Sequence, residues 1–258
     1  MQRFINPLKV WLDAGLNLLY PAVCQICQEQ RATAAEGYVC NRCWSGKGGV
    51  RFVVPPYCQR CGLPYEGEIT TDFLCGNCHG VQLHFNYARS AVIASPLVLE
   101  VIHRYKYRRD LWFESFLADL LVRQAVPALQ EEKWDLIVPV PLHPVKKRDR
   151  EFNQAESLAV RLGRAANLPV NKNLLRRVEW TRTQTQLTRQ ERASNVKRAF
   201  AVRAGQELNG EKIILVDDGM TTGATTSAGA WALSQAGAGE ICVWTVARGL
   251  MQGSNAAH

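Results

Sequence analysis

The sequence predicts an α/β protein: a largely parallel sheet flanked by helices, preceded by an N-terminal module with two zinc ribbons. Apolar, β-branched runs such as 213–217 and 240–247 alternate with helical stretches such as 224–236, which is typical of a parallel sheet covered on both faces. Eight of the nine cysteines fall into CxxC pairs before residue 80. The 258 residues give room for one substantial domain and a small module.

The predicted elements follow in chain order. After a helix at 5–19 and ribbons to about residue 80, we expect strands at 87–94, 135–140, 174–179, 213–217 and 240–247, and helical stretches at 96–130, 153–167 and 224–236. The predicted boundaries are 1–20 for the N-terminal helix, 21–82 for the double zinc ribbon, 83–250 for the α/β domain and 251–258 for a flexible tail.

The N-terminal stretch has apolar residues at helical spacing, with Lys9 and Asp13 among them. It lacks the small-residue cleavage site of a signal peptide, and no apolar run is long enough to span a bilayer. We therefore expect a cytoplasmic protein without stable membrane insertion, in which this helix packs on the domain. Association of the helix with a membrane surface is the alternative.

The cysteine pairs predict two structural zinc ions. The expected ligands are Cys24, Cys27, Cys40, Cys43, Cys58, Cys61, Cys75 and Cys78. A two-residue spacer lets both thiolates of a pair reach one ion, and two pairs complete a tetrahedral site with no open position. The near-duplication favours sequential pairing of the CxxC pairs, while interleaved pairing and iron–sulfur ligation stay open. Cys242 lies in an apolar run and is expected in a buried strand.

Positive charge is concentrated in one segment. Residues 140–203 hold fifteen Lys/Arg and five Asp/Glu, a net +10, although the whole chain carries only +8. Such a block favours a polyanionic ligand, either nucleic acid or clustered phosphates, with a solvated basic surface as the alternative.

The stretch "KIILVDDGMTTGATT" at 212–226 predicts a sugar-phosphate site. A buried strand is followed by an acidic pair, a turn of small residues and an Ala-rich helix, the arrangement in which backbone N–H groups hold a phosphate. The residues expected around the phosphate are Thr221, Thr222, Gly223, Ala224 and Thr225. Asp217 and Asp218 repel a phosphate but suit ribose hydroxyls, directly or through Mg²⁺.

"ILVDDGMTTGATT" resembles the ribose-5-phosphate loop of type I phosphoribosyltransferases, which bind phosphoribosyl pyrophosphate (PRPP). Gly219 stands where that pattern has a bulky apolar residue. The resemblance implies a type I phosphoribosyltransferase-like domain that binds PRPP with Mg²⁺. If such a protein turns the ligand over, Asp217 and Asp218 are the catalytic residues it implies.

Two further segments extend the resemblance. "IVPVPLHPVKKRDREFNQAESLA" at 137–159 implies a pyrophosphate loop made by Pro139, Val140, Pro141 and Leu142 with Arg148 and Arg150. "TRTQTQLTRQERASNVKRAF" at 181–200 resembles a mobile loop that closes over substrate, with Thr181, Gln184, Arg192 and Asn195 matching the pattern. With the cysteine pairs, these segments resemble the ComF/GntX family of competence and DNA-utilisation proteins over residues 18–247, apart from Glu151 in place of a usual glycine.

Two functions follow from this resemblance. One is a cytoplasmic factor for uptake and utilisation of extracellular single-stranded DNA, working with a DNA-uptake helicase or another DNA-processing protein and binding PRPP. The other is an active phosphoribosyltransferase with a nucleobase or nucleotide acceptor. The chain offers no evident second-substrate site, and Lys106 is a further candidate phosphate contact.

Overall fold

The structure is a computed structural model that describes residues 22–65, 67, 69, 72–142, 152–178 and 199–250. The predicted N-terminal helix and the tail at 251–258 lie outside these residues. So do Arg148, Arg150 and the mobile-loop residues Thr181, Gln184, Arg192 and Asn195. Among the described helices, none combines the length and apolar character that crossing a bilayer requires.

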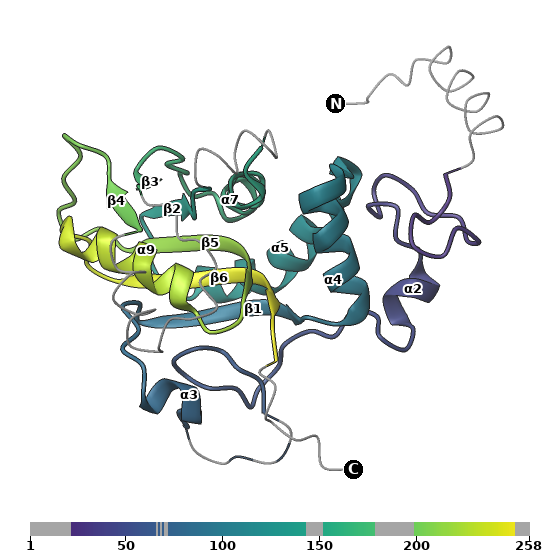
Figure 1. The fold of residues 1–258 in the computed structure, drawn as a ribbon, viewed down its shortest axis with the longest axis horizontal. Helices are drawn as coiled ribbons and strands as arrows, with labels where there is room; N and C mark the ends of the chain where they lie inside the picture. The colour runs from purple at the N-terminus through teal and green to yellow at the C-terminus, as the bar shows by residue number, and fades with distance from the viewer. Residues whose placement is uncertain are drawn as a thin grey trace, which may run out of the picture.

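A four-stranded parallel sheet forms the centre of the α/β domain (Figure 1). Its strands, in spatial order, are β1 (Tyr87–Ile93), β6 (Ile241–Arg248), β5 (Ile213–Met220) and β2 (Leu136–Pro139). Every residue of β6 is buried, and β5 is buried over its first four residues. Continuous apolar runs mark strands that are covered on both faces, and the structure confirms this prediction.

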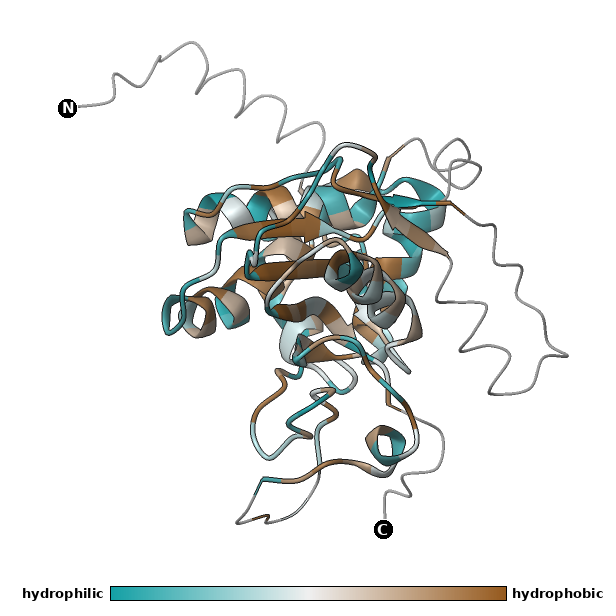
Figure 2. Ribbon diagram, turned by 90° about the vertical axis from the view of Figure 1, so that its left-hand side faces the viewer, coloured by the Kyte–Doolittle hydropathy of each residue, from teal (hydrophilic) through white to brown (hydrophobic). Residues whose placement is uncertain are grey.

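Helices cover both faces of the sheet. On one side lie α4 (Pro96–His103), α5 (Glu114–Gln130) and α7 (Gln154–Ala166). On the other lie α9 (Ala224–Gln235) and a hairpin of β3 (Leu175–Arg177) and β4 (Phe200–Val202). Alternate residues of β6 enter the two apolar cores, Trp244 on the first side and Val243 on the second. Figure 2 shows the apolar strands enclosed between these layers.

The predicted helical stretch 96–130 is wrong as one unit. After α4 the chain forms a π-helical turn, η1 (Arg104–Arg108), and a 3₁₀ turn, η2 (Leu111–Phe113). Arg109 between them has the left-handed backbone angle φ = 60°, which ends the helix. Arg104 Nε donates to Asp110 Oδ2 at 2.6 Å and holds the two sides of this break together.

Strand β5 is also longer than predicted. It continues from Ile213 through the acidic pair to Met220, because β6 supplies a partner as far as Arg248. Gly219 therefore lies within the sheet, opposite Ala247. The short strand β4, which the sequence did not predict, pairs antiparallel with β3.

The double ribbon covers the free edge of β1. Its two short helices are α2 (Asn41–Ser45) and α3 (Gly76–His79), one in each half. Between the halves, Val53 N donates to Ala91 O at 2.9 Å, and Ile93 N donates to Arg51 O at 2.8 Å. Because an uncovered edge strand is a template for unwanted pairing, this contact protects the sheet.

The two halves of the ribbon pack against different cores. Trp44 of the first half contacts Phe116 of α5 with ring centroids 5.3 Å apart. Cys58 and Cys61 of the second half belong to the apolar core that includes β5 and α9. The ribbon module thus contacts both layers around the edge strand (Figure 1).

Candidate functional site

The eight CxxC cysteines form two groups, each of four sulfurs within 4.8 Å of one another. The pairing is sequential: Cys24, Cys27, Cys40 and Cys43 in one group, and Cys58, Cys61, Cys75 and Cys78 in the other. This confirms the favoured arrangement and excludes the interleaved one.

Sulfur–sulfur distances in both groups fit one tetrahedral ion. Cys24 Sγ lies 3.8 Å from Cys43 Sγ, and in the second group the Cys61–Cys75 and Cys58–Cys78 sulfurs are 3.5 and 3.7 Å apart. A tetrahedron with Zn–S bonds of about 2.3 Å has edges of about 3.8 Å. Disulfides need sulfurs about 2.05 Å apart, and all of these cysteines are free. The donor set therefore fits structural zinc with no open coordination position.

Backbone amides prepare some of these thiols as ligands. Hydrogen bonds from the amides of Glu29 and Gln30 lower the pKa of Cys27 to about 6. Cys75 N donates to Cys58 Sγ at 3.3 Å. N–H donors of this kind favour the thiolate, which is the form that binds a metal.

The ninth cysteine belongs to neither group. Cys242 is buried in β6, as predicted, and burial raises the pKa of its thiol well above the usual value.

The acidic pair lies at the carboxyl end of β5. Asp217 Oδ1 accepts a hydrogen bond from Asp218 N at 2.9 Å, and Lys106 Nζ lies 2.7 Å from Asp218 Oδ1. The side chains of Lys106 and Asp218 are 22% and 13% exposed, so this ion pair is largely removed from water. It joins two segments more than a hundred residues apart, which periodicity alone does not predict.

Burial and the neighbouring charge of Asp218 raise the pKa of Asp217 to about 7. Lys106 and Arg177 of β3 act in the opposite direction, as does the backbone hydrogen bond from Asp218. The strand end therefore holds a group that titrates near neutral pH beside a cation, in the place where parallel sheets bind ligands.

The turn after β5 exposes the residues predicted to hold a phosphate. Thr221, Thr222, Ala224 and Thr225 are exposed, and Gly223 precedes α9 with φ = 79°. A glycine adopts this left-handed conformation without the strain that a side chain brings. Ala224 N donates to Thr222 Oγ1 at 3.4 Å. This arrangement leaves Ala224 and Thr225, at the start of α9, exposed to solvent.

The predicted pyrophosphate segment lies against the same edge. Pro139 pairs with Val216 in the sheet, and Val140 N donates to Val216 O at 2.8 Å, directly before Asp217. Asn153, which precedes α7, donates to Val140 O at 3.1 Å. Pro141 and Leu142 follow and are partly exposed. The fold thus brings the described part of this segment beside the acidic pair.

Arg248 is a residue of this edge that the sequence did not predict. It is 1% exposed at the end of β6 and donates to the carbonyl oxygens of Met220 and Thr221, at the start of the turn that precedes α9. The sequence does contain a signal for it, because an arginine that directly follows the seven-residue apolar run "ICVWTVA" lies at the end of a buried strand.

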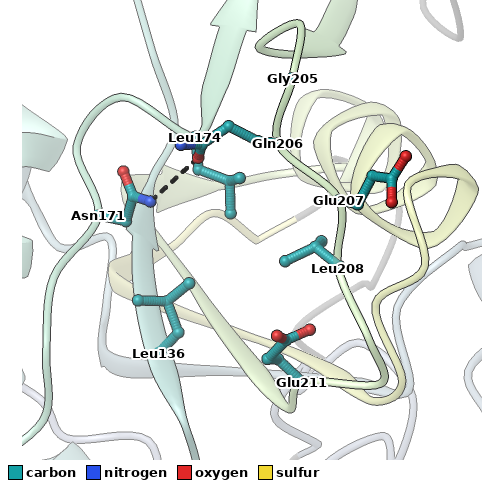
Figure 3. Close-up of a pocket in the computed structure, with 8 residues that line it drawn as sticks. All are labelled: Leu136, Asn171, Leu174, Gly205, Gln206, Glu207, Leu208 and Glu211. Atoms are coloured by element: carbon teal, nitrogen blue, oxygen red, sulfur yellow. Dashed lines mark hydrogen bonds between the residues drawn. The ribbon is translucent and has the colours of Figure 1, made fainter.

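A separate pocket of about 330 Å³ lies at the amino end of the sheet (Figure 3). Its lining includes Leu136 and Glu211, near the starts of β2 and β5, and Asn171, whose side-chain nitrogen donates to Gln206 Oε1 at 3.4 Å. It contains none of the predicted site residues, and we assign no ligand to it.

Fold and site together define a class of protein: a double zinc ribbon joined to a parallel α/β domain with an acidic strand end and a small-residue turn at its carboxyl edge. The family described as double zinc ribbon domain matches residues 15–79. Competence protein F of Haemophilus influenzae is 34% identical over 202 residues, covering 75% of this chain and 85% of that protein. The chain therefore belongs to the competence protein F family.

A second relative covers more of the chain. The DNA utilization protein YhgH of Escherichia coli is 29% identical over 238 residues, covering 90% of this chain and all of that protein. Among solved structures, adenine phosphoribosyl transferase of Trypanosoma brucei aligns with a TM-score of 0.36 and 14% identity, over 64% of this chain and 86% of that one.

Proposed function

We propose that this protein binds PRPP at the carboxyl edge of its sheet and serves the utilisation of incoming single-stranded DNA. The observation that carries the first part is the arrangement at the end of β5: an acidic pair, an exposed small-residue turn and an exposed start of helix α9 within one stretch of twelve residues, 214–225. The proposed 5′-phosphate ligands are the turn amides and the hydroxyls of Thr221, Thr222 and Thr225.

The ribose of PRPP lies against the acidic pair in this proposal. Asp217 and Asp218 accept hydrogen bonds from the 2′- and 3′-hydroxyls, and Lys106 balances the charge of Asp218. Pro139 and Pro141 have no N–H, and Val140 N donates to Val216 O, so in this proposal Leu142 N is the amide of residues 139–142 that faces the pyrophosphate. Arg148 and Arg150 are further proposed contacts. Carboxylate oxygens beside a pyrophosphate are the donors that Mg²⁺ prefers, so Asp217 and Asp218 suit a magnesium ion that arrives with the ligand.

The role in DNA utilisation is supported by the names of two relatives, competence protein F and DNA utilization protein YhgH. The net +10 of residues 140–203 supports a polyanionic partner. The proposed location is the cytoplasm, and the proposed protein partner is a DNA-uptake helicase or another DNA-processing protein.

Few of the aromatic side chains near the ribbons are available to stack on bases. Phe85 and Tyr105 are buried in the cores, and Trp44 packs on Phe116. Tyr107 is 62% exposed, has its ring centroid 5.0 Å from that of His103, and precedes the exposed Arg108 in the chain. Aromatic rings next to guanidinium groups suit single strands, so Tyr107 is the aromatic residue that we expect to contact DNA.

Calorimetric titration of the zinc-loaded protein with PRPP and Mg²⁺ tests the ligand. The Asp217→Ala/Asp218→Ala variant is compared with Asp135→Ala/Glu211→Ala, which removes two acids at the opposite edge of the sheet. We expect binding by the wild type and by the control, and at least a tenfold loss in the first variant. Equal affinity in all three proteins would show that the acidic pair does not contribute to PRPP binding.

DNA binding is tested separately by fluorescence anisotropy of a labelled single strand. We expect an affinity that falls with salt, by roughly 0.7 decades per decade of salt for each phosphate contact. Tyr107→Ala should weaken binding at every salt concentration without changing the slope, because a stacking contact releases no counterions. Affinity independent of salt would contradict the polyanion interpretation.

An active phosphoribosyltransferase is the second candidate, favoured by the position of the pyrophosphate segment next to the acidic pair. Departure of pyrophosphate leaves a ribosyl cation-like centre, which two carboxylates stabilise. Release of pyrophosphate from PRPP in the presence of nucleobases or single-stranded DNA would establish turnover. Binding without release would leave the protein as a PRPP-binding factor.

A further inference from the structure

Arg248 connects the second metal centre to the proposed phosphate turn. Its guanidinium donates to the carbonyl oxygens of Met220 and Gly249, both at 3.0 Å, and to that of Thr221. The same group donates to Cys61 O at 3.2 Å and Cys61 Sγ at 3.4 Å. One buried side chain thus bridges a metal ligand and the first residue of the turn.

A buried guanidinium requires compensation, because an unpaired charge away from water is costly. The Cys61 thiolate supplies it. Four thiolates around one Zn²⁺ carry a net negative charge, and hydrogen bonds to a charged acceptor are about twice as strong as neutral ones. Zinc at the second site therefore contributes to the position of Arg248, together with the carbonyl oxygens that accept from the same guanidinium.

Other contacts of the second ribbon support the same connection. Leu83 and Phe85, which follow this ribbon, lie within van der Waals distance of a Cβ built at Gly223. His84 N donates to Ser227 Oγ in the first turn of α9 at 3.0 Å. The first ribbon packs instead on α5, through Trp44.

On the other side of the bridge, Cys61 has little freedom to move. Gly62 has φ = +64°, and a Cβ at this residue would lie 2.5 Å from Ala88 O of β1. Ala88 N in turn donates to Arg60 O at 2.9 Å. These contacts hold the backbone around Cys61 against β1. Because Cys61 is held in place, its carbonyl oxygen and sulfur can fix the guanidinium of Arg248.

We propose that Arg248 is a positioning residue through which zinc at the second site controls ligand affinity at residues 221–225. Zinc bound by Cys58, Cys61, Cys75 and Cys78 fixes Arg248, and Arg248 fixes the Thr221 carbonyl. Loss of this zinc weakens anion binding at the turn. The identity of the ligand rests on the proposed function, whereas the coupling itself does not.

The test compares Cys78→Ser, which impairs the second site without touching Arg248, with the matched control Cys27→Ser in the first site. Zinc content, hydrogen exchange of a peptide covering 219–226 without ligand, and affinity for PRPP with Mg²⁺ are measured on each. For Cys78→Ser we expect loss of one zinc, roughly tenfold faster exchange and roughly tenfold weaker binding, a coupling within the usual range. For Cys27→Ser we expect loss of one zinc with less than a twofold change in the other two measurements.

Arg248→Lys separates positioning from metal binding. This variant keeps both zinc ions, but an ammonium cannot span the same acceptors, so exchange at 219–226 rises as in Cys78→Ser. Combining Arg248→Lys with Cys78→Ser should raise the exchange rate at 219–226 by less than a further twofold, because both changes remove the same link between Cys61 and the Thr221 carbonyl.

The measurements distinguish failure of this proposal from failure of the proposed function. If the wild type does not bind PRPP, the proposed function falls, and hydrogen exchange still decides the coupling. Unfolding of Cys78→Ser would show as fast hydrogen exchange in the strand peptide 241–246. In that case the second zinc is removed by chelation from Cys27→Ser, which holds only that ion, and the same measurements are made before and after chelation. Equal effects of the two cysteine variants, or unchanged exchange at 219–226 after loss of the second zinc, would overturn the proposal.

Discussion

Replacing Asp217 by asparagine should stabilise the ligand-free protein, and by an amount that depends on pH. The pKa of Asp217 is raised from 3.8 to about 7, chiefly by burial and then by the charge of Asp218. Between these pH values the folded protein binds more protons than the unfolded chain, so the free energy of unfolding falls as pH rises. Asparagine does not titrate, and its side-chain oxygen can keep the hydrogen bond from Asp218 N.

The size of the effect follows from the pKa shift. About three pH units at roughly 1.4 kcal/mol each set an upper limit of about 4 kcal/mol, reached above pH 7. The Asp217 side chain retains some contact with solvent, which screens the repulsion from Asp218, so we expect roughly 2 kcal/mol at pH 8 and less than 1 kcal/mol at pH 4.

Urea unfolding of wild type and Asp217→Asn across pH 4–8, without magnesium or phosphate, measures this difference. Asp135→Asn is the matched control, because it changes an exposed aspartate that accepts from Lys212 N at the opposite edge of the sheet. We expect the advantage of Asp217→Asn to grow from pH 4 to pH 7 and then level off. An advantage that is absent, or equal at both ends of the range, would refute the reasoning. The same variant should lose PRPP affinity, so stability and binding would move in opposite directions.

Three further predictions follow from single contacts. X-ray absorption should find two zinc ions per chain, each with four sulfur neighbours at about 2.3 Å, and nitrogen or oxygen in the first coordination sphere would contradict the assigned ligand sets. Thr245→Val should cost about 1–3 kcal/mol in urea unfolding, because it removes the partner of the buried Ser90 hydroxyl at 2.7 Å, and Ser90→Ala/Thr245→Val should recover most of the loss; a double variant as unstable as the single one would contradict this. Gly223→Ala should cost roughly 1–2 kcal/mol at its φ of 79° and weaken PRPP binding, whereas Gly205→Ala, at the same angle away from the site, should affect stability alone.

The cysteine ligands and their favoured grouping could be predicted because the information for them is local. A CxxC knuckle places two ligands within four residues, and the next knuckle lies only 12 or 13 residues away. The sequential grouping in the structure is the one that these short separations favour. Loop closure over short distances costs little entropy, so near pairs of knuckles are the expected partners.

The acidic pair was placed at the correct edge but in the wrong local structure. The sequence predicts a strand that ends at Asp217; in the structure, the strand continues to Met220 because Ala247 and Arg248 of β6 provide partners. Pairing between strands is a property of two distant segments. The apolar pattern of one segment does not reveal how far the pairing extends.

Lys106 shows the same limit for a helix. The periodicity of 96–130 predicts a continuous helix that leaves Lys106 on its surface. The π-helical turn and the left-handed Arg109 interrupt that helix, and Lys106 then reaches Asp218. An isolated lysine in a basic stretch gives no sign of such a partner, since the partner lies 112 residues away.

The contacts of the ribbon module argue that it is part of the binding domain and not an appendage. Its linker covers the open edge of β1, its first half extends the core beside α5, and its second half holds the residue that orients the phosphate turn. A module attached only for recognition would need one contact surface with the domain, and its removal would leave the sheet and turn intact. Here removal exposes an edge strand, opens two cores and leaves Arg248 as a buried charge without its thiolate. The zinc ions therefore stabilise the contacts between the ribbon module and the α/β domain as well as the ribbons themselves.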